Sequence, residues 1–329
     1  MLTSTLDAHQ LNSLFDRKTT SYKLIFFYSL LETTKKNLFD SNQVINLQDL
    51  NVDMLVNSWY PHSVFRLSFG YQDTIANKLD ELQIEIDKPL LKVTQNDKQI
   101  LREMIAEKLK ENGAEKSNKK DLRRYFPFRL IRPFFPELRG IEDAKANQEV
   151  ANLSISLFDS RRPIYKFTED LKSIILHPDW ANYFQRNYVI VHGWVIWNLI
   201  SYMQGKNPNS PGIANKIFPP LGERGSLQGQ TKYWKEVLRQ APDIRCIYSD
   251  LIIAENDLSL DHYLPWSFVA HNNLWNLIPT PKSINSSKSN RIPDQIYFEK
   301  MTELHYIGVR ESRKSFPGKM WRSYKLLVI

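Results

Sequence analysis

The sequence predicts an α+β protein in which a mainly helical N-terminal region precedes a small domain of strands and a helix. Three observations predict this fold class. Apolar residues recur at helical spacing within residues 1–205. Glycine, asparagine, proline and serine then cluster in residues 204–212, as expected of a domain junction. Short strand-like and helical segments follow. We therefore expect domains over residues 1–205 and 206–300, and a separate basic segment over 301–329.

The first part of the N-terminal region contains three segments with helical periodicity. Residues 2–15 and 21–34 are rich in apolar side chains that recur every three or four positions. Residues 101–112 form an amphipathic pattern that ends at an Asn-Gly pair, which stops helices. The polar stretch 114–120 that follows predicts a surface loop.

Three further segments constrain the same region. Residues 85–95 have the composition of a strand, and three prolines between residues 125 and 136 exclude a long helix there. The most apolar run, residues 188–203, is shorter than the roughly 20 residues needed to span a bilayer, and it contains His192. We interpret it as a buried core helix.

The second domain is expected to follow the order strand, strand, helix. Residues 229–240 predict a helix, residues 244–253 and 258–266 predict strands, and a further helix is expected near residue 285. The chain ends in a basic tail with Arg313, Lys314, Lys319, Arg322 and Lys325 against one acid, Glu311.

The composition excludes several classes of protein. With 42% hydrophobic and 24% charged residues, the chain has the balance of an ordinary globular protein. The excess of 44 lysines and arginines over 36 acids gives a net charge of +8, which favours nucleic acid over a membrane as the anionic partner. A lone cysteine, Cys246, forbids an intramolecular disulfide. The N-terminus lacks the pattern of a secretion signal, so we expect a cytoplasmic protein with no membrane partner.

Residues 260–290 concentrate aspartate, histidine and asparagine at separations that a hairpin and a helix could bring together. The first asparagine follows the histidine by 14 residues, and the second follows the first by 9 residues. A lysine comes three residues after the second asparagine. The set is Asp261, His262, Asn276, Asn285 and Lys288. Its order and spacing resemble the HNH (ββα-metal) endonuclease family over about residues 245–295.

The resemblance implies a role for each of these side chains. Hydrolysis of a phosphodiester needs a base to deprotonate water and positive charge near the leaving oxygen. His262 would be the base, because an ordinary histidine pKa near 6.5 leaves the ring largely neutral in the cell. Asn276 would position the loop and the ring. Asp261 and the side-chain oxygen of Asn285 are hard ligands that suit Mg²⁺ or Mn²⁺.

One feature departs from the family pattern. Many HNH domains bind a structural zinc through two Cys-x-x-Cys pairs, whereas this chain has only Cys246. We therefore expect no structural zinc, and we expect the domain to be held by packing of Trp266, Phe268 and Trp275.

Four other residues are candidates for contacts with substrate phosphate. Lys288 completes the motif, and His271 precedes Asn276 in the loop, where it could equally be a solvated loop histidine. Arg123 and Arg124 lie in a basic and aromatic stretch able to bind phosphates and stack on bases. The same stretch could instead be a basic loop with its aromatic residues in the core.

The resemblance thus implies a metal-dependent nuclease that acts on DNA in preference to RNA. The wider chain also resembles bacterial HNH proteins with an extended helical N-terminal region, which are often associated with restriction or antiphage defence, so we expect that setting. Two alternatives stay open: an RNA-cleaving toxin with the same chemistry, and a nucleic-acid-binding protein whose catalytic module is vestigial. A homo-oligomer or a partner protein of a defence system is compatible with either. Whether plasmid DNA or total RNA is degraded first would distinguish the DNA nuclease from the RNA-cleaving toxin.

Overall fold

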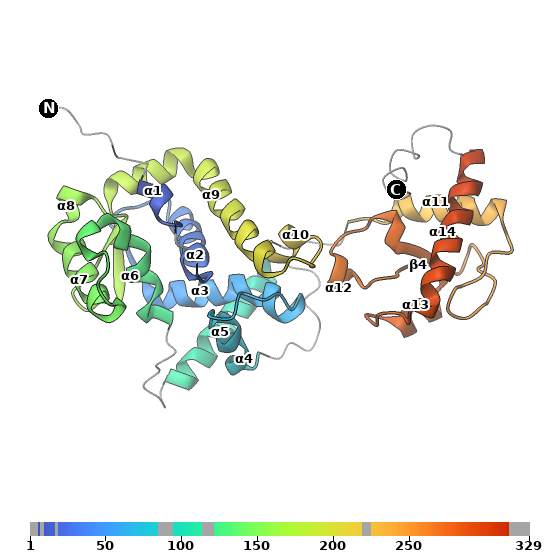
Figure 1. Ribbon diagram of the computed structural model, residues 1–329, viewed down its shortest axis with the longest axis horizontal. Helices are drawn as coiled ribbons and strands as arrows, with labels where there is room; N and C mark the ends of the chain where they lie inside the picture. Colours follow the sequence, from blue (N-terminus) through green and yellow to red (C-terminus); the bar gives the residue numbers. More distant parts are fainter. Residues whose placement is uncertain are drawn as a thin grey trace. The chain divides into compact units, whose positions relative to one another are not determined.

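The chain divides into two compact units in this computed structural model, which describes residues 6, 10–16, 19–84, 95–113, 122–218 and 225–315 (Figure 1). The N-terminal unit comprises residues 1–209 and 213–221, and the C-terminal unit comprises residues 210–212 and 222–329. Residues 85–94 of the strand expected at 85–95, the loop expected at 114–120 and the tail beyond residue 315 lie outside the described residues.

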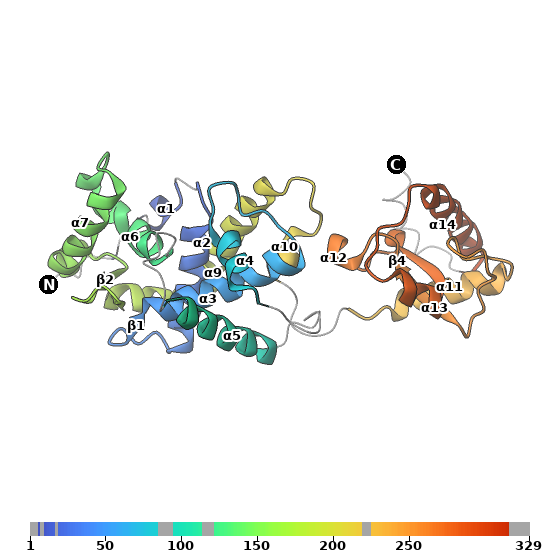
Figure 2. The same ribbon diagram turned by 90° about the horizontal axis from the view of Figure 1, so that it is seen from below.

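The N-terminal unit is built around α2 (Tyr22–Lys36), which packs between α3 (Leu47–Trp59) and α9 (Pro178–Lys206) (Figures 1 and 2). Leu24 and Phe26 of α2 are fully buried, and so are most of its other apolar side chains. A helix that is apolar on all sides is stable only when neighbours cover every side. The helix expected at residues 21–34 is therefore confirmed, with its burial explained by two partners.

Short helices and a small sheet surround this centre. The sheet is antiparallel in the order β1-β3-β2 and was not anticipated from the sequence. Its strands are β1 (Val44–Asn46), β2 (Tyr165–Phe167) and β3 (Ser173–Leu176). The α-helices are α1 (Gln10–Ser13), α4 (Ile75–Leu82), α5 (Gln95–Gly113), α6 (Phe126–Ile131), α7 (Asp143–Ser156), α8 (Phe158–Arg161) and α10 (Ile213–Ile217). Tyr60–Val64 is a π-helical turn, and Leu122–Arg124, Arg132–Phe134 and Pro136–Leu138 are 3₁₀ turns.

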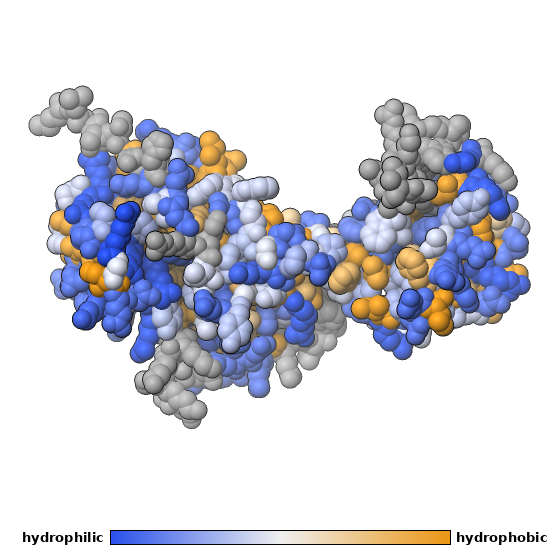
Figure 3. All heavy atoms as spheres, in the orientation of Figure 1, coloured by the Kyte–Doolittle hydropathy of each residue, from blue (hydrophilic) through white to orange (hydrophobic). Residues whose placement is uncertain are grey.

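Helix α9 corrects one expectation. Residues 188–203 are helical as predicted, but they are buried on one face only. Val195 and Leu199 face the core, whereas Val189 is 82% exposed and Trp197 is 69% exposed. Figure 3 shows apolar surface over this helix. Within the described ranges, none of the helices combines the length and the apolar character that a membrane-spanning segment needs.

The C-terminal unit contains the hairpin of β4 (Leu258–His262) and β5 (Leu277–Pro281), followed by α13 (Lys282–Lys288). The elements follow the expected ββα order, but the prediction of a strand at residues 244–253 is wrong. That segment makes only one bridge, between Arg245 and Ile252, because the chain reverses at Asp250 with a positive φ of 59°. The second strand is β5 instead.

Two long helices supply the core of this unit. Trp234 on α11 (Gln228–Gln240) is fully buried, and its indole nitrogen donates to the Leu277 carbonyl at 2.9 Å. Helix α14 (Ile296–Ser315) packs on α11, with Met301 and Leu304 in the same cluster. A Cβ at Gly308 would lie 2.9 Å from the Tyr233 hydroxyl, so the contact requires glycine.

This packing differs from the expectation in two ways. Helix α14 crosses residue 300, where a separate tail was expected to begin, because its apolar face belongs to the core. The core consists mainly of α11, the segment 244–253, β5 and α14, whereas Phe268 is 43% exposed. Trp266 is buried in the short helix α12 (Trp266–Val269), outside this cluster. Trp275 lies in the 3₁₀ turn Leu274–Asn276 and also lies outside it.

His305 makes the stability of the C-terminal unit depend on pH. Burial against the Trp234 ring lowers the pKa of His305 from 6.5 to about 4. Because the folded state resists protonation, the free energy of unfolding should be highest above pH 6.5 and should fall by about 3 kcal/mol towards pH 4. Urea unfolding of the full chain and of His305→Phe across this range measures the effect. The variant should lose this part of the pH dependence, and an identical slope in both proteins would contradict the assignment.

Candidate active site

Asp261 is the most constrained polar side chain of the hairpin. It lies near the end of β4 opposite Ile278 and is 2% exposed. Its Oδ1 accepts a hydrogen bond from Lys288 Nζ at 3.0 Å, and its Oδ2 accepts one from the Tyr248 hydroxyl at 2.9 Å. Burial raises the pKa of Asp261, and the attraction and hydrogen bonds of these two partners oppose that rise.

His262 follows Asp261 and contacts a side chain from the next loop. Its Nε2 lies 3.0 Å from Asn272 Oδ1, while Asn272 Nδ2 donates to the Gly225 carbonyl at 2.8 Å. The second bond fixes the orientation of the amide, so the atom that faces His262 is an acceptor. The neutral ring must then carry its proton on Nε2, and its basic lone pair lies on Nδ1.

The Asn276 side chain hydrogen-bonds the backbone of Leu264, two residues after His262. It has no exposed surface, its Nδ2 donates to the Leu264 carbonyl, and its Oδ1 accepts from the Leu264 amide, both at 2.8 Å. The Asn276 carbonyl also accepts from the Tyr263 amide. Asn276 is therefore a positioning residue for the loop that leaves β4.

Helix α13 brings two more motif residues to the same strand. Asn285 Nδ2 donates to Ser259 Oγ at 2.7 Å and to the Leu260 carbonyl at 3.2 Å. Because the amide nitrogen is used for the strand, its oxygen is the atom left to act as a ligand. Lys288 Nζ donates to the His262 carbonyl at 2.7 Å as well as to Asp261. The sequence-predicted Asp261, His262, Asn285 and Lys288 are thus gathered around the end of β4.

The donor set suits a hard divalent ion with few protein ligands. An ionised carboxylate has about four lone-pair sites, of which Tyr248 and Lys288 use two on Asp261. Asp261 and the Asn285 oxygen would leave room for water and phosphate, as Mg²⁺ prefers. The described residues contain no cluster of three His, Cys, Asp or Glu side chains fit for a metal, and this donor set does not require one.

The remaining candidates are placed elsewhere. His271 Nδ1 accepts from the Asn273 amide at 3.2 Å, and its ring packs on Trp275, which are contacts within its own loop. Arg123 and Arg124 are exposed in the N-terminal unit, on the 3₁₀ turn that precedes α6.

Two residues of the site were missed at the level of sequence. Tyr248 comes from the loop that was expected to be a strand, and burial with the charge of Asp261 raises the pKa of Tyr248, so the phenol stays a donor. Asn272 sits between two similar polar residues in His-Asn-Asn. No spacing rule distinguishes it, because its role depends on the Gly225 carbonyl, 47 positions away in the chain.

The ββα order and these side chains agree with the HNH module expected from the sequence. Residues 246–294 match the family described as HNH endonuclease, and this range includes all five motif residues. This match supports nuclease activity in general. Comparisons with curated proteins and with solved structures found no match.

The Asn272 contact predicts the tautomer of His262. In ¹⁵N-histidine-labelled protein at a pH where the ring is neutral, long-range ¹H–¹⁵N NMR should show the proton of His262 on Nε2. In Asn272→Leu the ring should become a mixture of tautomers, because the acceptor is gone. Asn273→Leu, at an exposed neighbouring asparagine, should leave the spectrum unchanged. A proton on Nδ1 in the unsubstituted protein would refute this orientation.

Proposed function

We propose that the C-terminal unit is a metal-dependent endonuclease that hydrolyses phosphodiester bonds, with DNA favoured over RNA. One observation carries the proposal: Lys288 Nζ hydrogen-bonds both Asp261 Oδ1 and the His262 carbonyl. This bridge ties the helix that carries Asn285 to the strand that carries the acid and the base.

His262 is the proposed general base. Its Nδ1 would take the proton of the attacking water, while the Nε2 proton stays on the bond to Asn272 Oδ1. Asn276 holds the backbone of Leu264, two residues after the base, and so limits its movement. The chain thereby supplies a base whose proton-accepting atom is fixed before substrate binds.

Asp261 and Asn285 are the proposed ligands of Mg²⁺ or Mn²⁺. The bound ion would supply positive charge to the phosphate and the leaving oxygen. Tyr248 holds one oxygen of Asp261, and Asn285 is fixed by Ser259, so both ligands are oriented by neighbours. Lys288 is proposed to contact a substrate phosphate, with His271, Arg123 and Arg124 as weaker candidates.

The biological setting is also a proposal. We assign residues 1–205 to recognition, regulation or assembly, and residues 206–300, together with the part of α14 that packs on them, to catalysis. The net charge of +8 supports a nucleic-acid partner. We propose restriction or antiphage defence in the cytoplasm, with a homo-oligomer or a defence partner. An RNA-cleaving toxin is the competing function, since it would use the same residues.

His262→Ala tests the proposed chemistry. Loss of a general base should lower the cleavage rate by about 10²- to 10⁴-fold. Purified protein would be incubated with plasmid DNA and with total RNA, in Mg²⁺, Mn²⁺ or EDTA. We expect cleavage with either metal, none with EDTA, and faster loss of DNA.

Asn273→Ala is the matched control, because it removes an exposed polar side chain of the same domain that has no proposed role in the site. It should cleave as the unsubstituted protein does. Full activity of His262→Ala, or activity in EDTA, would contradict the mechanism, and faster loss of RNA would favour the toxin.

A further inference from the structure

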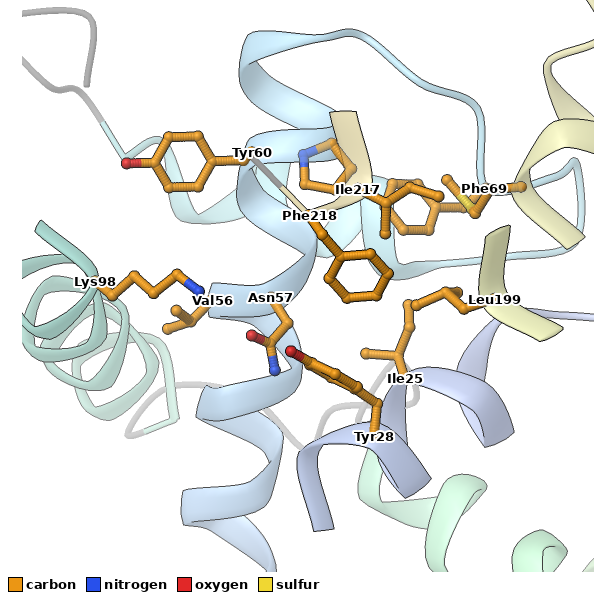
Figure 4. Close-up of a pocket in the computed structure, with 12 residues that line it drawn as sticks. Ile25, Tyr28, Val56, Asn57, Tyr60, Phe69, Lys98, Leu199, Ile217 and Phe218 are labelled. Carbon is orange, nitrogen blue, oxygen red and sulfur yellow. The ribbon is translucent and has the colours of Figure 1, made fainter. Parts of the chain in front are cut away.

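A partly open pocket in the N-terminal unit is large enough for a small ligand. It has a volume of about 180 Å³ and lies among α2, α3, α5, α9 and α10 (Figure 4). Ile25, Phe69, Leu199, Met203 and Phe218 supply its apolar walls. An engineered apolar cavity of about 150 Å³ is enough to bind benzene. The space is thus suited to a single planar ring.

Three polar side chains from different helices converge in this cavity. Figure 4 shows the ammonium of Lys98, the amide of Asn57 and the hydroxyl of Tyr28 directed towards one another. Asn57 is held by a 3.0 Å bond from its Nδ2 to Ser29 Oγ. Burial raises the pKa of Tyr28, so its hydroxyl remains a neutral donor. A few convergent polar groups in an apolar pocket are the usual features of a ligand site.

Within the part of the chain that the structure describes, Lys98 has no counter-ion in this pocket. Among the described residues, no carboxylate lies within the 4.0 Å of an ion pair with its ammonium. Glu32 is the acid that most affects it, but Glu32 is already bound by His192 Nε2 at 3.2 Å and by the Tyr188 hydroxyl. Burial lowers the pKa of Lys98, which reflects a cation withdrawn from water. An anionic ligand would restore the missing charge.

The walls indicate the rest of the ligand. The rings of Tyr28 and Phe218 lie 5.3 Å apart at 54°, and Phe69 and Tyr60 line the same space. Aromatic walls favour a flat ring in offset or edge contact. We propose that this cavity binds a small aromatic anion, with the ring among these walls and a carboxylate or phosphate group at Lys98, Asn57 and Tyr28. This proposal does not rest on the nuclease function.

Benzoate and phenyl phosphate are suitable probes, and benzamide is the uncharged control of the same shape. Binding to the full chain would be measured by calorimetry and by the shift in melting temperature. We expect at least one anion to bind, and benzamide to bind at least about tenfold more weakly. In Lys98→Met the anion should lose at least about tenfold in affinity and the preference over benzamide should vanish.

Two further variants keep the test decisive. Lys110→Met removes an exposed lysine from the same helix and should bind the anion normally. Phe218→Trp fills part of the cavity and should weaken anion and benzamide alike. Equal binding of benzamide and the anions, unchanged affinity in Lys98→Met, or no binding of either anion at about 10 mM would overturn the proposal.

Discussion

The buried contact between Lys288 and Asp261 organises the C-terminal unit. Their side chains are 8% and 3% exposed, so both charges are withdrawn from most of their water. Removing one partner of such a pair costs about 3–5 kcal/mol, because the other charge is left without compensation. Here the cost of burial is offset by Tyr248 on the carboxylate and by the His262 carbonyl on the ammonium. The same contact attaches α13 to the hairpin, and with it Asn285.

The rest of the unit makes that contact possible without metal-binding cysteines. Trp234 fills the space beneath β5 and is tied to the Leu277 carbonyl. Helix α14 packs on α11 and on β5, and Gly308 allows it to approach α11. Cys246 is buried in this cluster as an apolar side chain. Packing around β5 therefore holds the strand opposite Asp261 and His262.

Local patterns in the sequence predicted the features that depend on neighbouring residues. The order and spacing of Asp261, His262, Asn285 and Lys288 predicted side chains that meet near the end of β4, and helical periodicity predicted α2 and the core of α5. Features that depend on distant contacts could not be predicted. The bond of Asn272 to Gly225, the pairing of β1 with β3 and the exposed face of α9 are set by tertiary neighbours. The prediction for residues 244–253 was wrong because their apolar pattern is typical of a strand, whereas the turn at Asp250 prevents them from pairing as a continuous strand.

The central claim is that one divalent ion binds between Asp261 and Asn285. The most direct test is a crystal structure of the full chain with Mn²⁺, in which anomalous scattering locates the ion. We expect a single Mn²⁺ coordinated by an oxygen of Asp261 and by the side-chain oxygen of Asn285. Mn²⁺ bound only elsewhere, or an Asn285 oxygen turned towards Ser259 in the metal-bound state, would contradict it.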